Sequence, residues 1–237
     1  MNRFTFLPLH ISCDGRTIDL PGSGITAGSL QLSPELAEVI GVNLGDGGVY
    51  QYFAPRHSSY QVAFTASAAE FSYYQDFIKP TIDTTFSVNC RVYLRSDNTT
   101  RLQIGSKKIV VFLASLGIPI GKKFDASIPN EIVEQGLIVH FIRGIYHAEG
   151  YIYRRYSKMY NRHKKVYSNL LVIQIRMKLR TLMHQIRTEL RNLGIIPNRL
   201  TEKDGVYTLR ITAQDEIRKF FEIIRPRYKL SPHSASL

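Results

Sequence analysis

The chain carries the same kind of helix end twice, about a hundred residues apart. The first copy reads Ile-Gly-Val-Asn-Leu-Gly-Asp-Gly-Gly over residues 40–48, and the second reads Ile-Arg-Gly-Ile-Tyr-His-Ala-Glu-Gly-Tyr over residues 142–151. Each copy has two small residues four positions apart, Gly41 and Gly45 in the first, Gly144 and Ala148 in the second. Residues at this spacing share one helix face, and small side chains there let two backbones approach closely. The pattern therefore predicts two helices that pack against each other through these faces.

A carboxylate follows the second small residue in both copies, as Asp46 and as Glu149. An acid at a helix C-terminus is unfavourable for stability because the helix macrodipole is already negative there. Each acid precedes a glycine, Gly47 or Gly150, which predicts a left-handed turn that ends the helix. One such dipeptide alone would be interpreted as a helix cap, but two copies in the same context favour a shared cation site.

Four segments between and after these helix ends carry a resemblance to a known family. They are residues 101–108 (Arg-Leu-Gln-Ile-Gly-Ser-Lys-Lys), 116–123 (Leu-Gly-Ile-Pro-Ile-Gly-Lys-Lys), 128–132 (Ile-Pro-Asn-Glu-Ile) and 207–214 (Tyr-Thr-Leu-Arg-Ile-Thr-Ala-Gln). With the paired helix ends, they resemble the LAGLIDADG homing endonucleases in their single-chain, two-repeat form. The resemblance covers roughly residues 32–226.

The resemblance implies an α+β fold of two pseudo-symmetric αββαββα repeats. Antiparallel sheets would form a DNA-binding saddle, with the two motif helices at the interface between the repeats. The expected organisation is an N-terminal arm (1–31), a first repeat (32–127), a second repeat (128–228) and a C-terminal tail (229–237).

Hydrophobic periodicity predicts the same order of elements in both halves. In the first half, helices are expected over 34–45, 67–79 and 107–116, and strands over 49–53, 60–65, 87–95 and 100–104. In the second half, helices are expected over 130–148, 179–193 and 214–224, and strands over 151–156, 169–177, 199–201 and 207–211. Ser33 before Pro34 favours a capped start of the first helix, and Pro80 is expected to end the second helix.

The net charge of +12 is unevenly distributed. Residues 1–130 hold 11 Lys and Arg against 10 Asp and Glu, while residues 131–237 hold 20 against 9. Such an excess favours a polyanionic partner, although a solvated basic face or a membrane surface stays open. Basic residues alternate with aromatic and β-forming residues, as in 151–156, which favours nucleic acid. No run approaches the roughly 20 apolar residues of a membrane span, and two unrelated cysteines indicate neither zinc nor a disulfide framework, so a cytoplasmic protein is expected.

Strand alternation places polar, basic and aromatic side chains on one face of each predicted sheet and apolar side chains on the other. The wet face of any antiparallel sheet has this character, but a two-stranded ribbon also fits the major groove of DNA, where Arg, Gln and Asn read base edges. The DNA-binding candidates are Tyr50, Tyr52, Gln61, Asn89, Arg91, Tyr93, Arg95, Arg101, Gln103, Tyr151, Tyr153, Arg155, Gln174, Arg176, Thr208 and Arg210.

The resemblance also implies a catalytic site. Asp46 and Glu149 would each bind Mg²⁺ or Mn²⁺, helped by the backbone carbonyls of Gly45 and Ala148, and both DNA strands would be cut to leave short 3′ overhangs. Two acids suffice because Mg²⁺ usually takes few protein ligands and keeps several waters.

The family places a polar or basic residue of each repeat near the reacting phosphates. The matching positions here are Lys107 and Gln214, where the second departs from lysine. Gln carries no charge, so the two strands are expected to be cut at unequal rates. A solvated lysine at a helix start is an equally good interpretation of Lys107. His147, where the family often has an acid, is expected to form a hydrogen bond at the helix interface.

The predicted function is a monomeric endonuclease that recognises a long pseudo-palindromic DNA site and promotes intron homing. The chain begins Met-Asn-Arg and ends Ser-Ala-Ser-Leu, unlike an intein, so an intron-encoded enzyme of the archaeal ribosomal RNA type is expected. Two alternatives stay open. One is an RNA maturase of the same fold that binds intron RNA, and the other is a nucleic-acid-binding protein that has lost cleavage.

Overall fold

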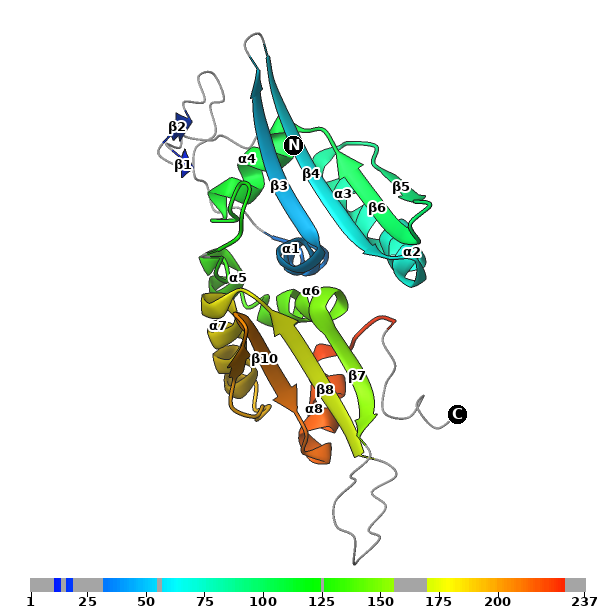
Figure 1. Cartoon of the computed structure of the whole chain (residues 1–237), viewed down its shortest axis with the longest axis vertical. Helices are drawn as coiled ribbons and strands as arrows, with labels where there is room; N and C mark the ends of the chain where they lie inside the picture. Colours follow the sequence, from blue (N-terminus) through cyan, green and yellow to red (C-terminus); the bar gives the residue numbers. More distant parts are fainter. Residues whose placement is uncertain are drawn as a thin grey trace, which may run out of the picture.

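Figure 1 shows the computed structural model, which describes residues 11–13, 16–18, 32–54, 57–124, 126–155 and 170–228. Of the predicted N-terminal arm, only the short strands β1 (Ile11–Cys13) and β2 (Arg16–Ile18) belong to this set, and they pair antiparallel. The predicted tail 229–237 and the residues 156–169 between two predicted strands lie outside the described residues.

The first half begins with the motif helix α1 (Pro34–Asp46) and continues into an antiparallel sheet of order β3-β4-β6-β5. Its strands are β3 (Gly47–Ala54), β4 (His57–Ser67), β5 (Arg91–Leu94) and β6 (Thr99–Ile104). The helical segments are η1 (Ala68–Glu70), α2 (Phe71–Tyr73), the π-helical turn η2 (Tyr74–Ile78), α3 (Lys79–Phe86) and α4 (Lys107–Ser115).

The second half repeats this order after a short helix. It consists of α5 (Asn130–Glu134), the motif helix α6 (Ile138–Glu149), β7 (Gly150–Arg155), β8 (Leu170–Met177), α7 (Arg180–Asn192), β9 (Thr201–Lys203), β10 (Val206–Ile211) and α8 (Gln214–Ile224). Its antiparallel sheet has the order β7-β8-β10-β9, which matches the first sheet position by position. The two αββαββα repeats predicted from the sequence are therefore confirmed.

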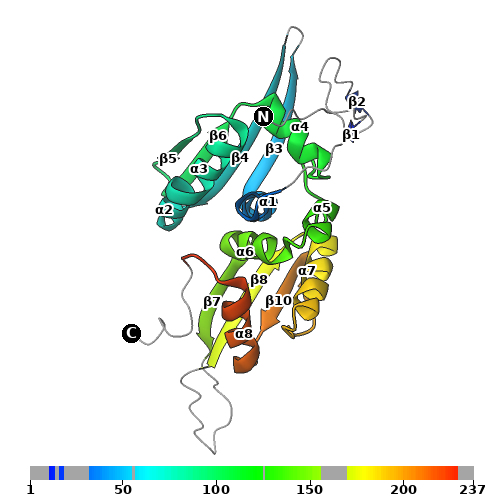
Figure 2. The same ribbon diagram turned by 180° about the vertical axis from the view of Figure 1, so that it is seen from behind.

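The helices cover one side of both sheets and leave the other side open. The open side faces the viewer in Figure 1, and α3, α4, α7 and α8 lie in front of the sheets when the molecule is seen from behind in Figure 2. Strand alternation explains the arrangement, because Phe64, Leu102 and Ile104 point from the first sheet into the core. The motif helices α1 and α6 lie between the two halves, and the buried side chains form one hydrophobic cluster that extends through both. In the described part of the chain, every helix is too short or too polar to cross a lipid bilayer.

The start of α1 follows the predicted capping pattern. Ser33 has extended backbone angles, its hydroxyl accepts a hydrogen bond from the Leu36 amide at 3.1 Å, and Pro34 takes the first helical position, where its missing N–H costs nothing. This cap fixes the register of α1, and therefore the position of Asp46 at its last residue.

The structure corrects the prediction that the second helix ends at Pro80. The helical path continues to Phe86 because the π-helical turn of residues 74–78 comes directly before the proline. Such a wider turn has a different hydrogen-bond pattern, and it lets the chain absorb a residue that lacks an N–H. The hydroxyl of Thr81 donates to the Phe77 carbonyl at 2.8 Å, one turn earlier.

Two further predictions about the motif helices were wrong. The helix predicted over 130–148 is divided into α5 and α6 by Gly136, whose φ of +68° belongs to the left-handed region. Gly47 and Gly150 do not form left-handed turns, because both are extended, with φ of −92° and −96°. Both must be small because there is no space for a side chain. A Cβ at Gly47 would lie 2.5 Å from the side-chain nitrogen of Asn43, and a Cβ at Gly150 would lie 2.3 Å from the Tyr146 ring.

Candidate active site

The two motif helices interlock through their small residues. A Cβ on Gly41 would lie 2.3 Å from the Phe141 carbonyl oxygen, and one on Gly144 would lie 2.0 Å from the Glu38 carbonyl oxygen. The backbones therefore touch along one line, as the small-residue spacing predicted. At the end of this line, a Cβ on Gly45 would lie 3.0 Å from Cγ of Glu149. The contact brings the end of α1, and with it Asp46, against the end of α6.

Both acids are half-buried in this contact. The Oη of Tyr74 donates to Oδ2 of Asp46 at 3.2 Å and so restrains the orientation of that carboxylate. Burial raises the pKa of Tyr74 well above its usual value, and the charge of Asp46 raises it further, so the phenol stays a neutral donor. Tyr74 comes from the π-helical turn after β4, and nothing in its local sequence indicated this contact.

A lysine that the sequence did not single out completes the site. Nζ of Lys123 donates to the carbonyl oxygens of Asn43, Leu44 and Gly45 at 2.8, 3.0 and 3.0 Å. Burial lowers the pKa of Lys123 to about 8, although the charges of Glu149 and Asp46 act in the opposite direction. The lysine is therefore within electrostatic reach of both acids and sits at the C-terminal end of α1.

The residues present fit a divalent cation. The Gly45 carbonyl already accepts an ammonium group, which shows that this helix end favours positive charge. The other donors are carboxylate oxygens, which Mg²⁺ and Mn²⁺ prefer. Among the described residues, no group of three or more His, Cys, Asp or Glu side chains is arranged to hold a metal.

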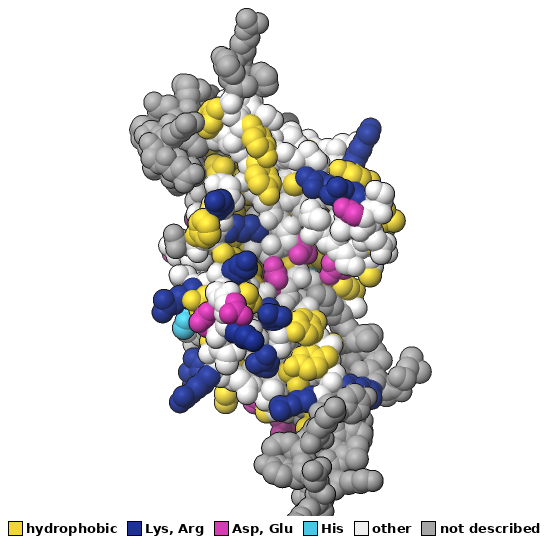
Figure 3. Space-filling view, viewed as in Figure 1, with side chains coloured by type: hydrophobic (Ala, Val, Ile, Leu, Met, Phe, Trp, Pro, Cys, Tyr) yellow, Lys and Arg dark blue, Asp and Glu magenta, His cyan; other side chains and the backbone are white. Residues whose placement is uncertain are grey.

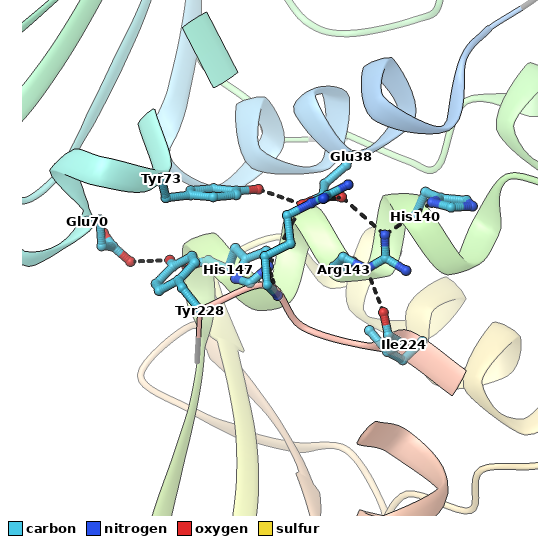
Figure 4. A network of polar contacts seen from close by, with 9 residues as sticks. Glu38, Glu70, Tyr73, His140, Arg143, His147, Ile224 and Tyr228 are labelled. Atoms are coloured by element: carbon cyan, nitrogen blue, oxygen red, sulfur yellow. Dashed lines mark hydrogen bonds and ion pairs between the residues drawn. The ribbon is translucent and has the colours of Figure 1, made fainter. Parts of the chain in front are cut away.

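A buried charge cluster centred on Glu38 lies earlier on the motif helices than the two acids do. Figure 4 shows the residues of this cluster. The fully buried Glu38 of α1 accepts hydrogen bonds from Tyr73 at 2.9 Å, from Arg143 of α6 at 3.3 Å and from Arg227 at 2.9 Å. Arg143 also donates through Nε to the Ile224 carbonyl. The cluster joins residues of both halves and the segment that follows α8.

His147 takes the structural role predicted for it. Its Nε2 accepts a hydrogen bond from the Arg227 amide at 3.1 Å, and its ring stacks on Tyr228 with centroids 4.4 Å apart. The single hydroxyl proton of Tyr228 is shared between two acceptors, Glu70 at 2.6 Å and the His147 carbonyl at 2.9 Å. Burial raises the pKa of Tyr228 most, and the hydrogen bond to Glu70 raises this pKa further.

The open sheet face carries the side chains predicted to bind DNA. Figure 3 shows basic and hydrophobic side chains over both sheets and acidic ones gathered between them. The strand register pairs Tyr50 with Gln61, Arg91 with Gln103, and Tyr93 with Arg101, so these residues share one face. The candidates that are exposed or half-buried are Tyr50, Tyr52, Gln61, Asn89, Arg91, Tyr93, Arg95, Arg101, Gln103, Tyr151, Tyr153, Arg155, Arg176 and Arg210.

Two candidates on the second sheet lie below this surface. Gln174 is 4% exposed and Thr208 is 7% exposed. Oε1 of Gln174 accepts from Nε of Arg210 at 2.8 Å, and its amide donates to the Tyr151 hydroxyl. Gln174 thus braces two side chains that reach the surface, and contact of this face with DNA remains a prediction.

Lys107 and Gln214 begin α4 and α8, at corresponding positions of the two halves. Lys107 is exposed, and its Nζ lies 5.6 Å above the centroid of the Tyr60 ring. The Gln214 side chain accepts from the Leu171 amide at 3.1 Å and donates to the carbonyls of Leu171 and Thr212 at 3.0 Å. These bonds hold β8 against the start of α8, which indicates a structural use of Gln214. The catalytic roles of both residues remain predictions.

Two repeats with one acid at the end of each interlocked helix define a pseudo-symmetric protein whose site is built by both halves. Residues 137–225 match the family model described as a LAGLIDADG-like domain. No curated protein matches the chain.

Solved structures of the homing endonuclease I-DmoI and of a LAGLIDADG meganuclease are similar to most of this chain. I-DmoI in complex with DNA and Mn is 22% identical with a TM-score of 0.57, and the match covers 82% of this chain and 98% of that one. The LAGLIDADG meganuclease I-AabMI bound to uncleaved DNA is 11% identical with a TM-score of 0.58, and the match covers 86% and 87% of the two chains. The second half of the chain is therefore a LAGLIDADG-like domain, and the chain as a whole has the two-repeat LAGLIDADG fold.

Proposed function

We propose that this protein is a site-specific, metal-dependent DNA endonuclease that cuts both strands and serves intron homing. The observation that carries the proposal is the meeting of Asp46 and Glu149 at a helix end that accepts cations, midway between two sheets with basic and aromatic open faces. The DNA complexes of I-DmoI and I-AabMI support it, because both proteins share this fold.

The two sheet faces are suited to bind the two halves of a long duplex site. Arginines such as Arg91, Arg101 and Arg176 can contact phosphates or guanine edges in the major groove. The exposed tyrosines beside them, among them Tyr52 and Tyr151, offer both an apolar ring and a hydroxyl. Since the residues differ between the halves, the two half-sites need not be identical.

Phosphodiester hydrolysis needs an activated water and relief of negative charge on the leaving oxygen. A divalent ion held by Asp46 and Glu149, with the Gly45 and Ala148 carbonyls, would supply both. Tyr74 keeps the Asp46 carboxylate in one orientation, and the interlocked helices keep the two acids together. Because both acids lie on one chain, we expect the protein to act as a monomer.

The test is cleavage of a randomised duplex-DNA library with Mg²⁺ by the wild type, by Asp46→Asn and by Glu149→Gln. We expect each substitution to lower double-strand cleavage by more than about a thousandfold, because several kcal/mol of charge stabilisation is lost. Binding should be largely retained, because the acids lie between the sheets. Glu222→Gln, an exposed carboxylate on α8, is the matched control and should cut like the wild type.

Sequencing of the cut ends decides between the remaining alternatives. Selective cuts around one long site by the wild type, and by neither acid variant, support the endonuclease. Undiminished cleavage by both variants would refute the assignment of the acids. Tight, salt-sensitive binding without any cutting would favour the binding-only or maturase alternative, which an RNA splicing assay then separates.

A further inference from the structure

Lys123 has a position that its own sequence neighbourhood does not explain. It lies between α4 and α5, near the end of the first repeat, about 80 residues from the helix end that it contacts. The segment is fixed just before it, because Ile120 forms a parallel bridge with Val49 and the Gly121 amide donates to the Val49 carbonyl at 2.7 Å. Gly121 then turns the chain with a φ of +87°. These contacts aim the lysine at the end of α1.

The ammonium offsets a charge problem in α1. This helix has no basic residue in its last turn and ends with Asp46, so its C-terminus combines the macrodipole with a carboxylate. Three carbonyls use all three donors of the ammonium, and both acids attract it. Lys123 is therefore a cation that the chain itself places where the proposed divalent ion would take a ligand, the Gly45 carbonyl.

The second half solves the same problem with a neutral group. The segment after its last helix returns Tyr228, whose hydroxyl donates to the carbonyl of His147 in the last turn of α6. Leu44 is the residue of α1 that corresponds to His147, and it receives the Lys123 ammonium. Each repeat thus ends in a segment that closes its own motif helix, but one closure carries a positive charge and the other is a phenol.

We propose that Lys123 is a positioning residue: its ammonium holds the end of α1 when metal is absent and competes with the metal for the Gly45 carbonyl. Metal binding through the Gly45 carbonyl then requires this ammonium to move or to give up one of its three acceptors. This inference rests on the proposed function, since it concerns the same metal site.

The experiment compares Lys123→Met with Lys122→Met in the full chain, without DNA and at neutral pH. Lys122 is the exposed neighbour, so both variants lose one charge from the same segment. Thermal unfolding with and without Mn²⁺, and calorimetric titration with Mn²⁺, are measured for both variants, for the wild type and for Asp46→Asn. We expect Lys123→Met to unfold at a lower temperature than Lys122→Met. It should also bind Mn²⁺ about tenfold more tightly than the wild type does, a change of about 1.4 kcal/mol.

The outcomes separate this inference from the proposed function. An equal loss of stability with and without Mn²⁺, together with unchanged or weaker Mn²⁺ affinity, would mean that Lys123 is only a structural cap and would overturn the inference. A second result also overturns the inference: Asp46→Asn abolishes Mn²⁺ binding, while Lys123→Met leaves the Mn²⁺ affinity unchanged. This result would still support the metal site at Asp46. If neither the wild type nor any variant binds Mn²⁺, the metal part of the proposed function fails, and the competition fails with it.

Discussion

Asp83 shows how a single carboxylate can fix the chemistry of its neighbours. Its Oδ1 accepts from the Cys90 amide at 2.7 Å, while Oδ2 pairs with Lys79. These contacts anchor the residue before β5 to α3. Burial raises the pKa of the Cys90 thiol to about 12, and the hydrogen bond and charge of Asp83 add to the effect. The thiol is thus held in its unreactive form.

We expect Cys90 to resist alkylation by iodoacetamide in the folded protein throughout the range from neutral pH to about pH 10. The thiolate is the reactive species, and its fraction stays small until the pH approaches 12, so the rate should rise with pH only in strong base. Mass spectrometry of the peptide that contains Cys90 gives the rate. In urea the pKa should return to about 8.5 and modification should be rapid. Fast labelling of the folded protein near pH 8 would contradict the prediction.

At the residue scale, the sequence predicts what local pattern encodes and misses what distant contacts create. Asp46, Glu149 and the small residues beside them follow from spacing along one helix. Lys123 and Glu38 do not, because Lys123 contacts residues 78–80 positions earlier and Glu38 pairs with Arg227, 189 positions later. A buried glutamate on an apolar helix face is one local signal of such a partner, since a charge is rarely fully buried without one.

At the scale of elements, the crossing of α1 and α6 depends on glycines that meet backbone and not flexible side chains. A Cβ on Gly144 would lie 2.0 Å from the Glu38 carbonyl oxygen and 2.9 Å from the Val42 amide nitrogen. Neither atom can move without shifting α1. The close approach of α1 and α6 at this point therefore requires that residue 144 has no Cβ methyl group.

We expect Gly144→Ala to destabilise the protein by about 1–3 kcal/mol or more, because overpacking forces the helices apart. Thermal or urea unfolding measures the loss. Gly105→Ala is the matched control, since a Cβ there meets only the Tyr60 carbonyl oxygen at 3.9 Å and its φ is not positive. The prediction fails if the two variants are equally stable.

The elements themselves were largely predictable, and the exceptions have physical causes. Alternation and periodicity give most of the strands and the motif helices, because these have one buried face. The strand predicted over 199–201 lies at Thr201–Lys203, where all three residues are exposed and no buried face marks the bounds. Periodicity alone did not show that a π-helical turn would carry the chain past Pro80, nor that Gly136 would divide the second motif helix. The π-helical turn and the break at Gly136 are features of the backbone, and the pattern of apolar residues does not distinguish them from a continuous α-helix.

At the scale of the whole molecule, Glu38 ties the two halves together. Its carboxylate belongs to the first half, while Arg143 and Arg227 belong to the second. The guanidinium of Arg227 also lies 3.9 Å above the ring of Phe77 in the first half. Charges buried in this way are strongly dependent on one another, because removal of one leaves the others without compensation.

We expect Glu38→Gln to lower the free energy of unfolding by about 3–5 kcal/mol, the usual effect of breaking a buried ion pair. Glu35→Gln, on the exposed face of the same helix, changes the net charge equally and should cost less than about 1 kcal/mol. Urea unfolding of both variants is the measurement. A loss at Glu38 no larger than that at Glu35 would show that the cluster does not hold the halves together.

The division of the acids between two interlocked helices has a consequence for damaged molecules. In the endonuclease proposed here, heat, mutation or misfolding that undocks the halves leaves one carboxylate on each and a complete catalytic pair on neither. The protein would then lose its nuclease activity before either half unfolds, and a partly folded copy could not cut DNA. The close contact of the glycines of α1 and α6 would in this way limit DNA damage by misfolded molecules.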